Sequence, residues 1–154
     1  MTLPPPRSLA ERRHDVRTRF EADVDAWVST ADGDGNPYLV PLSFLWDGTA
    51  FVISTVRTSP TSRNLLAGGK VRLALGGTRD VVLVEGSAVP IEVGEQAGTP
   101  GGDLGDAFAT KTGFDPRELA TPYQYFRIEP LRVQAWREVN ELPGRDVMQK
   151  GHWL

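Results

Sequence analysis

The chain has 154 residues, of which 40% are hydrophobic and 8% aromatic, so it can bury the core of a single folded domain. Its formal net charge of −3 gives no overall attraction to nucleic acid or to an anionic membrane, and we expect neither as a partner. The lack of cysteine excludes disulfides and thiolate chemistry, and with only two histidines we expect no metal site.

The first 22 residues are predicted to form an extended arm and a helix, ahead of a barrel domain that spans residues 23–154. The opening "MTLPPPRSLAERR" lacks the apolar core of a signal peptide, which predicts a cytoplasmic protein. Ser8 and Glu11 have the spacing of a helix capping box, and a helix is expected from there to about residue 20. Its apolar face, opposite the arginines, consists of Leu9, Val16 and Phe20.

From residue 24 onward, apolar runs alternate with turn sequences, as in β-strands joined by hairpins. "DGDGNP" is predicted to be a tight hairpin turn, and "DG" at 47–48 is a second hairpin signal. The tail from residue 144 can add a short final strand. The predicted strands are residues 24–30, 38–46, 49–55, 71–75, 80–92 and 123–136.

The last of these strands changes its alternation in the middle. Phe126 and Ile128 share one parity, and the apolar residues after them share the other: Leu131, Val133 and Ala135. Because a slip of one residue moves every later side chain to the other face, we predict a β-bulge near Glu129 and Pro130.

Three further helices are predicted between the strands. Residues 59–69 form a short helix with Ser59 as the N-cap and Pro60 in the first turn, and two more are expected at 103–113 and 115–120. The glycine-rich segment 93–103 is predicted to be a flexible linker. Six to seven strands in hairpin order, with helices at the periphery, predict a mainly β fold built as a closed antiparallel barrel.

The segment "STVRTSPTSRNL", residues 54–65, has the composition of an anion site. Arg57 and Arg63 supply charged donors, and the predicted helix start adds free backbone N–H groups. An ordinary solvated loop with a serine cap explains the same spacing equally well. The hydroxyl groups of the segment belong to Ser54, Thr55, Thr58, Ser59, Thr61 and Ser62.

The order of these segments resembles the pyridoxamine 5′-phosphate oxidase-like family of FMN-binding split barrels, which includes the flavin- and deazaflavin-dependent oxidoreductases of actinobacteria. The similar features are a strand, a "DG" turn, a strand ending in "IST", and then "SPTSRNL" and "VRLAL". The segment "YFRIEPLRVQAW" resembles the family's closing strand. The resemblance extends from about residue 23 to residue 136.

This resemblance implies a homodimer that binds its cofactor, FMN or the deazaflavin F-420, in a groove between the subunits. It implies that the backbone of residues 41–43 lies along the ring system, and that Ser54 and Thr55 face the ribityl chain. The phosphate is expected at Arg57, Ser59 and Arg63. The complete set of expected cofactor-binding residues is Pro41, Leu42, Ser43, Ser54, Thr55, Arg57, Thr58, Ser59, Thr61 and Arg63.

The chain departs from the family pattern in ways that bear on function. Thr61 replaces a lysine that the family often has, which removes one cation from the expected phosphate site. No substrate lysine or histidine like those of true pyridoxamine phosphate oxidases is evident, so we do not predict oxidation of vitamin B6. Short members without that substrate site resemble the deazaflavin branch, which favours F-420 over FMN.

Aromatic residues on the predicted strands have two possible roles. Trp27, Trp46 and Trp136 are expected to pack in the core or in a dimer interface, and the alternative role is a ring stacked near an isoalloxazine. Tyr123 and Tyr125 are expected to pack as well, although either could donate a proton near a cofactor.

Three functions remain open from the sequence. The first is an oxidoreductase that passes a hydride from F-420 or FMN to an unsaturated or conjugated small molecule; its catalytic residues are not identified. The second is a protein that binds or carries a flavin, a haem or another tetrapyrrole without turnover, for which His14 and His152 are the residues to test. The third is a dimeric scaffold that has lost its cofactor.

Overall fold

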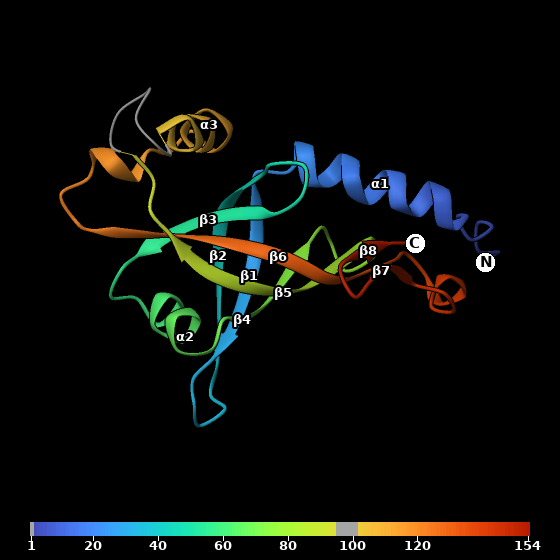
Figure 1. The fold of residues 1–154 in the computed structure, drawn as a ribbon. Helices are drawn as coiled ribbons and strands as arrows, with labels where there is room; N and C mark the ends of the chain where they lie inside the picture. The colour runs from blue at the N-terminus through green and yellow to red at the C-terminus, as the bar shows by residue number, and fades with distance from the viewer. Residues whose placement is uncertain (1, 95–101) are drawn as a thin grey trace.

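A computed structural model describes residues 2–94 and 102–154, and within them the chain forms one antiparallel sheet of eight strands (Figure 1). The strands are β1 (Asp25–Ala31), β2 (Pro37–Trp46), β3 (Phe51–Val56), β4 (Lys70–Leu75), β5 (Val81–Ile91), β6 (Tyr123–Trp136), β7 (Asp146–Gln149) and β8 (His152–Trp153). The helices are α1 (Leu9–Ala22), α2 (Pro60–Gly68) and α3 (Gly102–Thr112), with short 3₁₀ helices η1 (Pro116–Glu118) and η2 (Val139–Glu141).

The sheet closes on itself to make a barrel. The strand order is β3-β2-β1-β4-β5-β6-β7-β8, and β6 pairs with β3 as well as with β5. Residues Phe51 to Val56 of β3 lie opposite Ile128 to Tyr123 of β6. The predicted mainly β, antiparallel split barrel is therefore confirmed. The described residues contain one strand more than the upper expected number, because the tail forms two short strands, β7 and β8.

The predicted turns are confirmed, and each is held by an aspartate. The carboxylate of Asp32 accepts hydrogen bonds from the backbone N–H groups of Asp34 and Asn36, both at 2.9 Å. The carboxylate of Asp47 accepts from the backbone N–H of Ala50 at 2.8 Å. Such bonds replace the backbone partners that the chain lacks in a tight turn.

The predicted bulge in β6 is also confirmed. Glu85 of β5 opposes Arg132 of β6. The next residue, Gly86, opposes Pro130, so Leu131 lies between the two pairs without a partner. Leu131 was expected to share a face with Val133 and Ala135, which are buried. This prediction is wrong, because the bulge turns the Leu131 side chain outward and leaves it 46% exposed.

Gly86 lies at this register shift because β6 leaves no room for a side chain there. A Cβ atom at Gly86 would come within 2.6 Å of the Ile128 Cγ2 atom and 3.1 Å of the Glu129 carbonyl oxygen. We expect Gly86→Ala to lower the free energy of unfolding by about 1–3 kcal/mol, as overpacking does in other cores. Urea unfolding of the variant measures this.

Gly77 provides the matched control, since a Cβ atom there would meet nothing within 4 Å. Gly77→Ala should leave the free energy of unfolding within about 0.5 kcal/mol of the original value. Equal stability of the Gly86 and Gly77 variants would contradict the close approach of β5 and β6.

Helix α1 covers one end of the barrel with a face that differs in part from the predicted one. The capping box of Ser8 and Glu11 is confirmed. Val16 and Phe20 are buried as expected, and the Phe20 ring lies 4.7 Å from the ring of Phe51, centroid to centroid. The predicted burial of Leu9 is wrong, because Leu9 is exposed and Arg12 is buried in its place.

Arg12 and Arg7 tie the N-terminal segment to the C-terminal part of the chain. The Arg12 Nη1 atom donates to the backbone carbonyl oxygen of Glu141 at 3.0 Å. Arg7 donates to the buried Glu141 carboxylate through Nε and Nη2, both at 3.0 Å. The backbone N–H of Arg137 donates to the same carboxylate at 2.8 Å. Both chain ends lie on this side of the barrel (Figure 1).

The connection between β5 and β6 contains the two predicted helices. α3 and η1 confirm the helices expected at 103–113 and 115–120. Most of the linker predicted at 93–103 lies outside the described residues. No described helix combines the length and the apolar character needed to cross a membrane.

Candidate functional site

The barrel opens where β2 and β3 separate. Within the described residues, their pairing ends at Phe44 and Ile53. Beyond that point Ser43 pairs with Asp25 of β1, while β3 continues along β6. The facing edges of β2 and β3 therefore carry backbone N–H and C=O groups that are not used in pairing with each other.

A pocket of about 490 Å³, here called the edge pocket, lies at this separation. Its volume is in the range of small-molecule and cofactor sites. Half of the ten predicted site residues line it. They are Pro41, Leu42, Ser43, Ser54 and Thr55.

Aromatic residues that the sequence did not assign to the site form much of the remaining wall. Phe108 of α3, Phe114 and Tyr123 line the edge pocket. The rings of Phe114 and Tyr123 lie 5.5 Å apart, and Phe108 packs edge-on against Tyr125 at 5.6 Å. The only sequence signal for this wall was the predicted helix at 103–113, because a helix that packs on a barrel must bury an apolar residue such as Phe108.

The polar groups of the edge pocket include one hydroxyl without a partner. The Ser54 Oγ atom is buried and has no hydrogen-bond partner among the described residues. Ser43 differs, since its Oγ atom donates to the carboxylate of Asp25 at 2.6 Å. Buried polar atoms nearly always have a partner, so the Ser54 hydroxyl fits a ligand with a polar group at this position.

The start of α2 has the predicted capping arrangement. The Ser59 Oγ atom accepts from the backbone N–H of Ser62 at 3.1 Å, and Pro60 follows it as the first helical residue. Ser59 also shares a hydrogen bond of 3.2 Å with the Thr55 hydroxyl. Thr61 is only 1% exposed, so its side chain lies inside the protein and not in the edge pocket.

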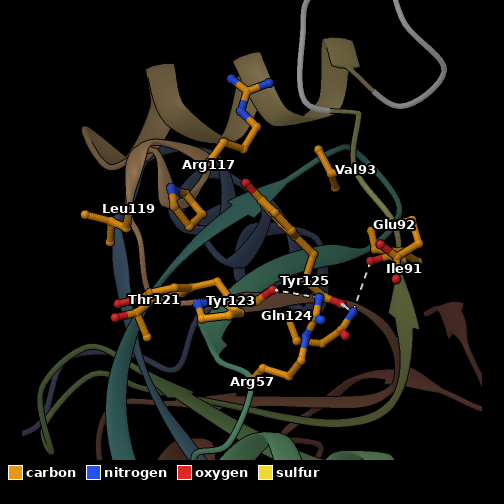
Figure 2. Close-up of a pocket in the computed structure, with 12 residues that line it drawn as sticks. Arg57, Ile91, Glu92, Val93, Arg117, Leu119, Thr121, Tyr123, Gln124 and Tyr125 are labelled. Atoms are coloured by element: carbon orange, nitrogen blue, oxygen red, sulfur yellow. Dashed lines mark hydrogen bonds between the residues drawn. The ribbon is translucent and has the colours of Figure 1, made fainter.

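The predicted cations do not line the edge pocket in this structure. Thr58 and Arg63 are exposed and lie outside it. Arg57 lines a second pocket of about 450 Å³, here called the Arg57 pocket, which shares Tyr123 with the edge pocket (Figure 2). The Arg57 Nη2 atom donates to the Tyr123 carbonyl oxygen at 3.5 Å. The structure therefore divides the predicted phosphate site between a helix start and a separate pocket.

Lys111 of α3 anchors the helix to the barrel. Its Nζ atom donates to the backbone carbonyl oxygen of Asp23 at 2.7 Å and lies 5.1 Å from the centroid of the Phe44 ring. Burial lowers the pKa of Lys111, and the charge of Asp23 opposes this shift in part. The two contacts hold α3, and with it Phe108, over the edge of β2.

Neither histidine lies at a pocket described above. His14 on α1 and His152 on β8 are both exposed and line neither the edge pocket nor the Arg57 pocket. Across residues 2–94 and 102–154, no three side chains of His, Cys, Asp or Glu are gathered as they would be around a metal ion.

The barrel is closed by the pairing of β3 with β6 and is split where β2 and β3 separate. This arrangement defines the protein as a split β-barrel. Residues 13–137 match the sequence profile of pyridoxamine 5′-phosphate oxidase, and the chain belongs to this family. The resemblance found in the sequence is therefore confirmed. No curated protein sequence shows significant similarity to the chain.

Solved structures share the fold at low sequence identity. A FAD-binding protein from Mesorhizobium loti is 19% identical, with a TM-score of 0.62 over 79% of this chain and 90% of its own. An F420 reductase is 17% identical, with a TM-score of 0.56 over 76% of this chain and 94% of its own. A haem-binding protein from Mycobacterium smegmatis is 18% identical, with a TM-score of 0.64 over 98% of this chain and 60% of its own.

Proposed function

We propose that the protein binds a flavin-type cofactor, F-420 or FMN, in the edge pocket and acts as an oxidoreductase. The observation that carries the proposal is the buried, unpartnered hydroxyl of Ser54 between the free edges of β2 and β3. The FAD-binding protein and the F420 reductase with the same fold support a cofactor of this class.

Each part of the site has a role in this proposal. The free edge of residues 41–43 offers backbone groups to the heterocyclic ring, and Phe114 packs beside that space. Ser54 and Thr55 offer hydroxyls to the ribityl chain. The start of α2 at Ser59 offers the phosphate backbone N–H groups and a positive dipole end.

Two arginines complete the phosphate site in the proposal. Arg63 lies in the first turn of α2, and Arg57 is two residues before Ser59. Arg57 contacts the phosphate only if its side chain turns away from Tyr123, where a single long hydrogen bond holds it. Thr58 is exposed beside them, whereas Thr61 is buried and acts by filling space under the helix.

The bound cofactor supplies hydride transfer to an unsaturated or conjugated small molecule. The residues of this chain position the cofactor and exclude water from it. Phe108 and Phe114 restrict access of water from the α3 side. Tyr123 also lines the edge pocket, and its hydroxyl or solvent supplies the proton that the reduced product needs.

A second copy of the chain is the proposed partner, because an apolar surface adjoins the edge pocket. Trp27 is 50% exposed and lies opposite Pro41, which also lines the pocket. Leu39 is 58% exposed and lies opposite Ser29, two residues further along β1. Residues directly opposite on neighbouring strands share a face, so these side chains form one surface on the outside of the barrel.

Trp27→Glu is expected to convert the dimer into a monomer, because it places a charge at the centre of this surface. Size-exclusion chromatography with light scattering measures the mass. Val139→Glu is the matched control, since Val139 is exposed on η2 and should leave the mass unchanged. A monomeric wild-type protein, or a dimeric Trp27 variant, would contradict the proposal.

Haem binding is the second candidate, and the haem-binding structure from Mycobacterium smegmatis favours it. Haem iron usually takes an axial ligand such as histidine. His14 and His152 lie outside both pockets described above, so the site geometry favours the flavin-type cofactor. Retention of haem binding in the His14→Ala and His152→Ala variants would show that neither histidine is the ligand.

Fluorescence titration of the cofactor-free protein with FMN and with F-420 tests the proposed function. We expect micromolar binding of one of them, weakened at least tenfold in the Arg57→Ala, Arg63→Ala double variant, because charge-assisted hydrogen bonds contribute about 1.5–3 kcal/mol each. The bound, reduced cofactor should then be oxidised faster with 2-cyclohexen-1-one than without it. No binding of either cofactor would contradict the proposal, and binding without turnover would leave only a carrier.

A further inference from the structure

The Arg57 pocket has its own set of polar groups, separate from the edge pocket. It is lined by Arg57, Gln124 and Tyr125, together with apolar side chains that include Ile91 and Leu119. Its volume of about 450 Å³ is sufficient for a molecule with one ring. In Figure 2 the Arg57 side chain extends toward the start of β6, where Tyr123 and Gln124 lie. Tyr123 lines both pockets.

Tyr125 is the strongest sign that the Arg57 pocket binds a ligand. Its side chain is only 7% exposed, and its hydroxyl has no hydrogen-bond partner among the described residues. Figure 2 shows the hydroxyl directed from β6 toward the segment that carries Arg117. A buried hydroxyl without a partner costs about 1–3 kcal/mol, which a ligand with a polar group would recover.

Gln124 is held in place so that one end of its amide remains available. Its Nε2 atom donates to the carbonyl oxygens of Ile91 at 3.2 Å and Tyr125 at 3.0 Å. These two bonds occupy both protons of the amide nitrogen, which leaves the amide oxygen as an acceptor. In Figure 2 this amide lies on the Arg57 side of the pocket, away from the Tyr125 hydroxyl.

Charge in the pocket favours a single negative group on the ligand. Arg117 is neutralised, because its guanidinium donates to Asp106 and Asp115, both at 2.8 Å. It is directed toward α3 in Figure 2. Arg57 forms no ion pair within the described part of the chain and is the available cation. The carboxylate of Glu92 also lines the pocket and disfavours a doubly charged phosphate.

We propose that the Arg57 pocket is a binding site for a small organic carboxylate that carries a hydroxyl group, formed while Arg57 points toward Tyr123 and away from the proposed cofactor phosphate. Arg57 binds the carboxylate with its planar pair of donors. Tyr125 binds the hydroxyl at the end of the pocket away from Arg57, and Ile91 and Leu119 contact the apolar part of the molecule between them.

The test uses 4-hydroxybenzoate as the probe and 4-hydroxybenzamide as its uncharged control of the same shape. Isothermal titration calorimetry on the cofactor-free protein should show that the acid binds at least tenfold more tightly than the amide. Arg57→Gln should remove this preference. Arg79→Gln is the matched control, because Arg79 is exposed and outside the pocket, and it should bind the acid as the original protein does.

Tyr125→Phe tests the second contact without disturbing the fold. We expect the affinity for 4-hydroxybenzoate to fall by about three- to tenfold, as for loss of one hydrogen bond. The melting temperature should stay equal or rise, because the variant removes a buried hydroxyl without a partner. Equal binding of acid and amide, or unchanged binding of the acid by Arg57→Gln, would overturn the proposal. Since no cofactor is present, these results do not depend on the proposed function.

Discussion

Glu141→Gln is expected to lower the free energy of unfolding by about 3 kcal/mol, measured by urea unfolding at pH 7. Loss of one partner from a buried ion pair costs about 3–5 kcal/mol. We expect the lower end of this range for two reasons. The Arg7 side chain is 12% exposed and can take up water, and glutamine keeps one acceptor oxygen for the Arg7 donors.

Glu138→Gln is the matched control. Glu138 pairs with Arg79 at 2.8 Å, but the Arg79 side chain is 79% exposed. Pairs of this kind contribute about 0–1 kcal/mol, so the control should be nearly as stable as the original protein. Equal losses in the two variants would contradict a structural role for the Arg7–Glu141 contact.

The same contact should make stability depend on pH in the acid range. Burial by itself raises the pKa of Glu141, but hydrogen bonds from Arg7 and from the backbone N–H groups of Arg7 and Arg137 outweigh it and lower the pKa to about 2 from 4.5. A lowered pKa stabilises the fold fully above pH 4.5, and this contribution is lost as the pH falls toward 2. The stability difference between wild type and Glu141→Gln should shrink across that interval.

Ser54→Leu should abolish cofactor binding, with a loss of more than about a hundredfold in affinity, or about 2.7 kcal/mol. The leucine side chain fills part of the edge pocket and removes the only polar group there that is buried without a partner among the described residues. Ser54→Ala keeps the space and removes only the hydroxyl, so it should lose about five- to tenfold. Fluorescence titration with FMN or F-420, whichever the protein binds, measures the loss of affinity in both variants.

Ser87→Leu is the control for the change in residue type, because Ser87 is exposed on β5 and lies outside the edge pocket. Circular dichroism must show that the Ser54 variants are folded. A folded Ser54→Leu protein that binds the cofactor as tightly as wild type would show that the cofactor lies elsewhere.

Much of the barrel could be predicted from local patterns. Alternation gave the strands, Asp32 and Asp47 marked the hairpins, and the change of phase after Ile128 gave the bulge. The sequence did not show that Leu9 is exposed and Arg12 buried. An arginine is rarely placed inside from pattern alone, because its burial depends on carbonyl acceptors and a carboxylate that come from the far end of the chain.

The candidate site was predictable only where it is made of consecutive residues. The family resemblance assigned residues 41–43, Ser54 and Thr55 to the cofactor site, and all of them line one pocket. Phe108 and Phe114 were missed, because a wall supplied by α3 and by the segment that follows it leaves no motif beside the strands that it covers. The place of Arg57 could not be predicted either, because the direction of a long exposed side chain depends on neighbours in the fold, here the carbonyl oxygen of Tyr123.

A crystal structure of the protein grown with the cofactor that it binds tests the central claim most directly. The account predicts the cofactor ring in the edge pocket, with its density along the free edge of residues 41–43 and within hydrogen-bond distance of the Ser54 hydroxyl. Cofactor density in the Arg57 pocket, or on a surface away from the separation of β2 and β3, would contradict it.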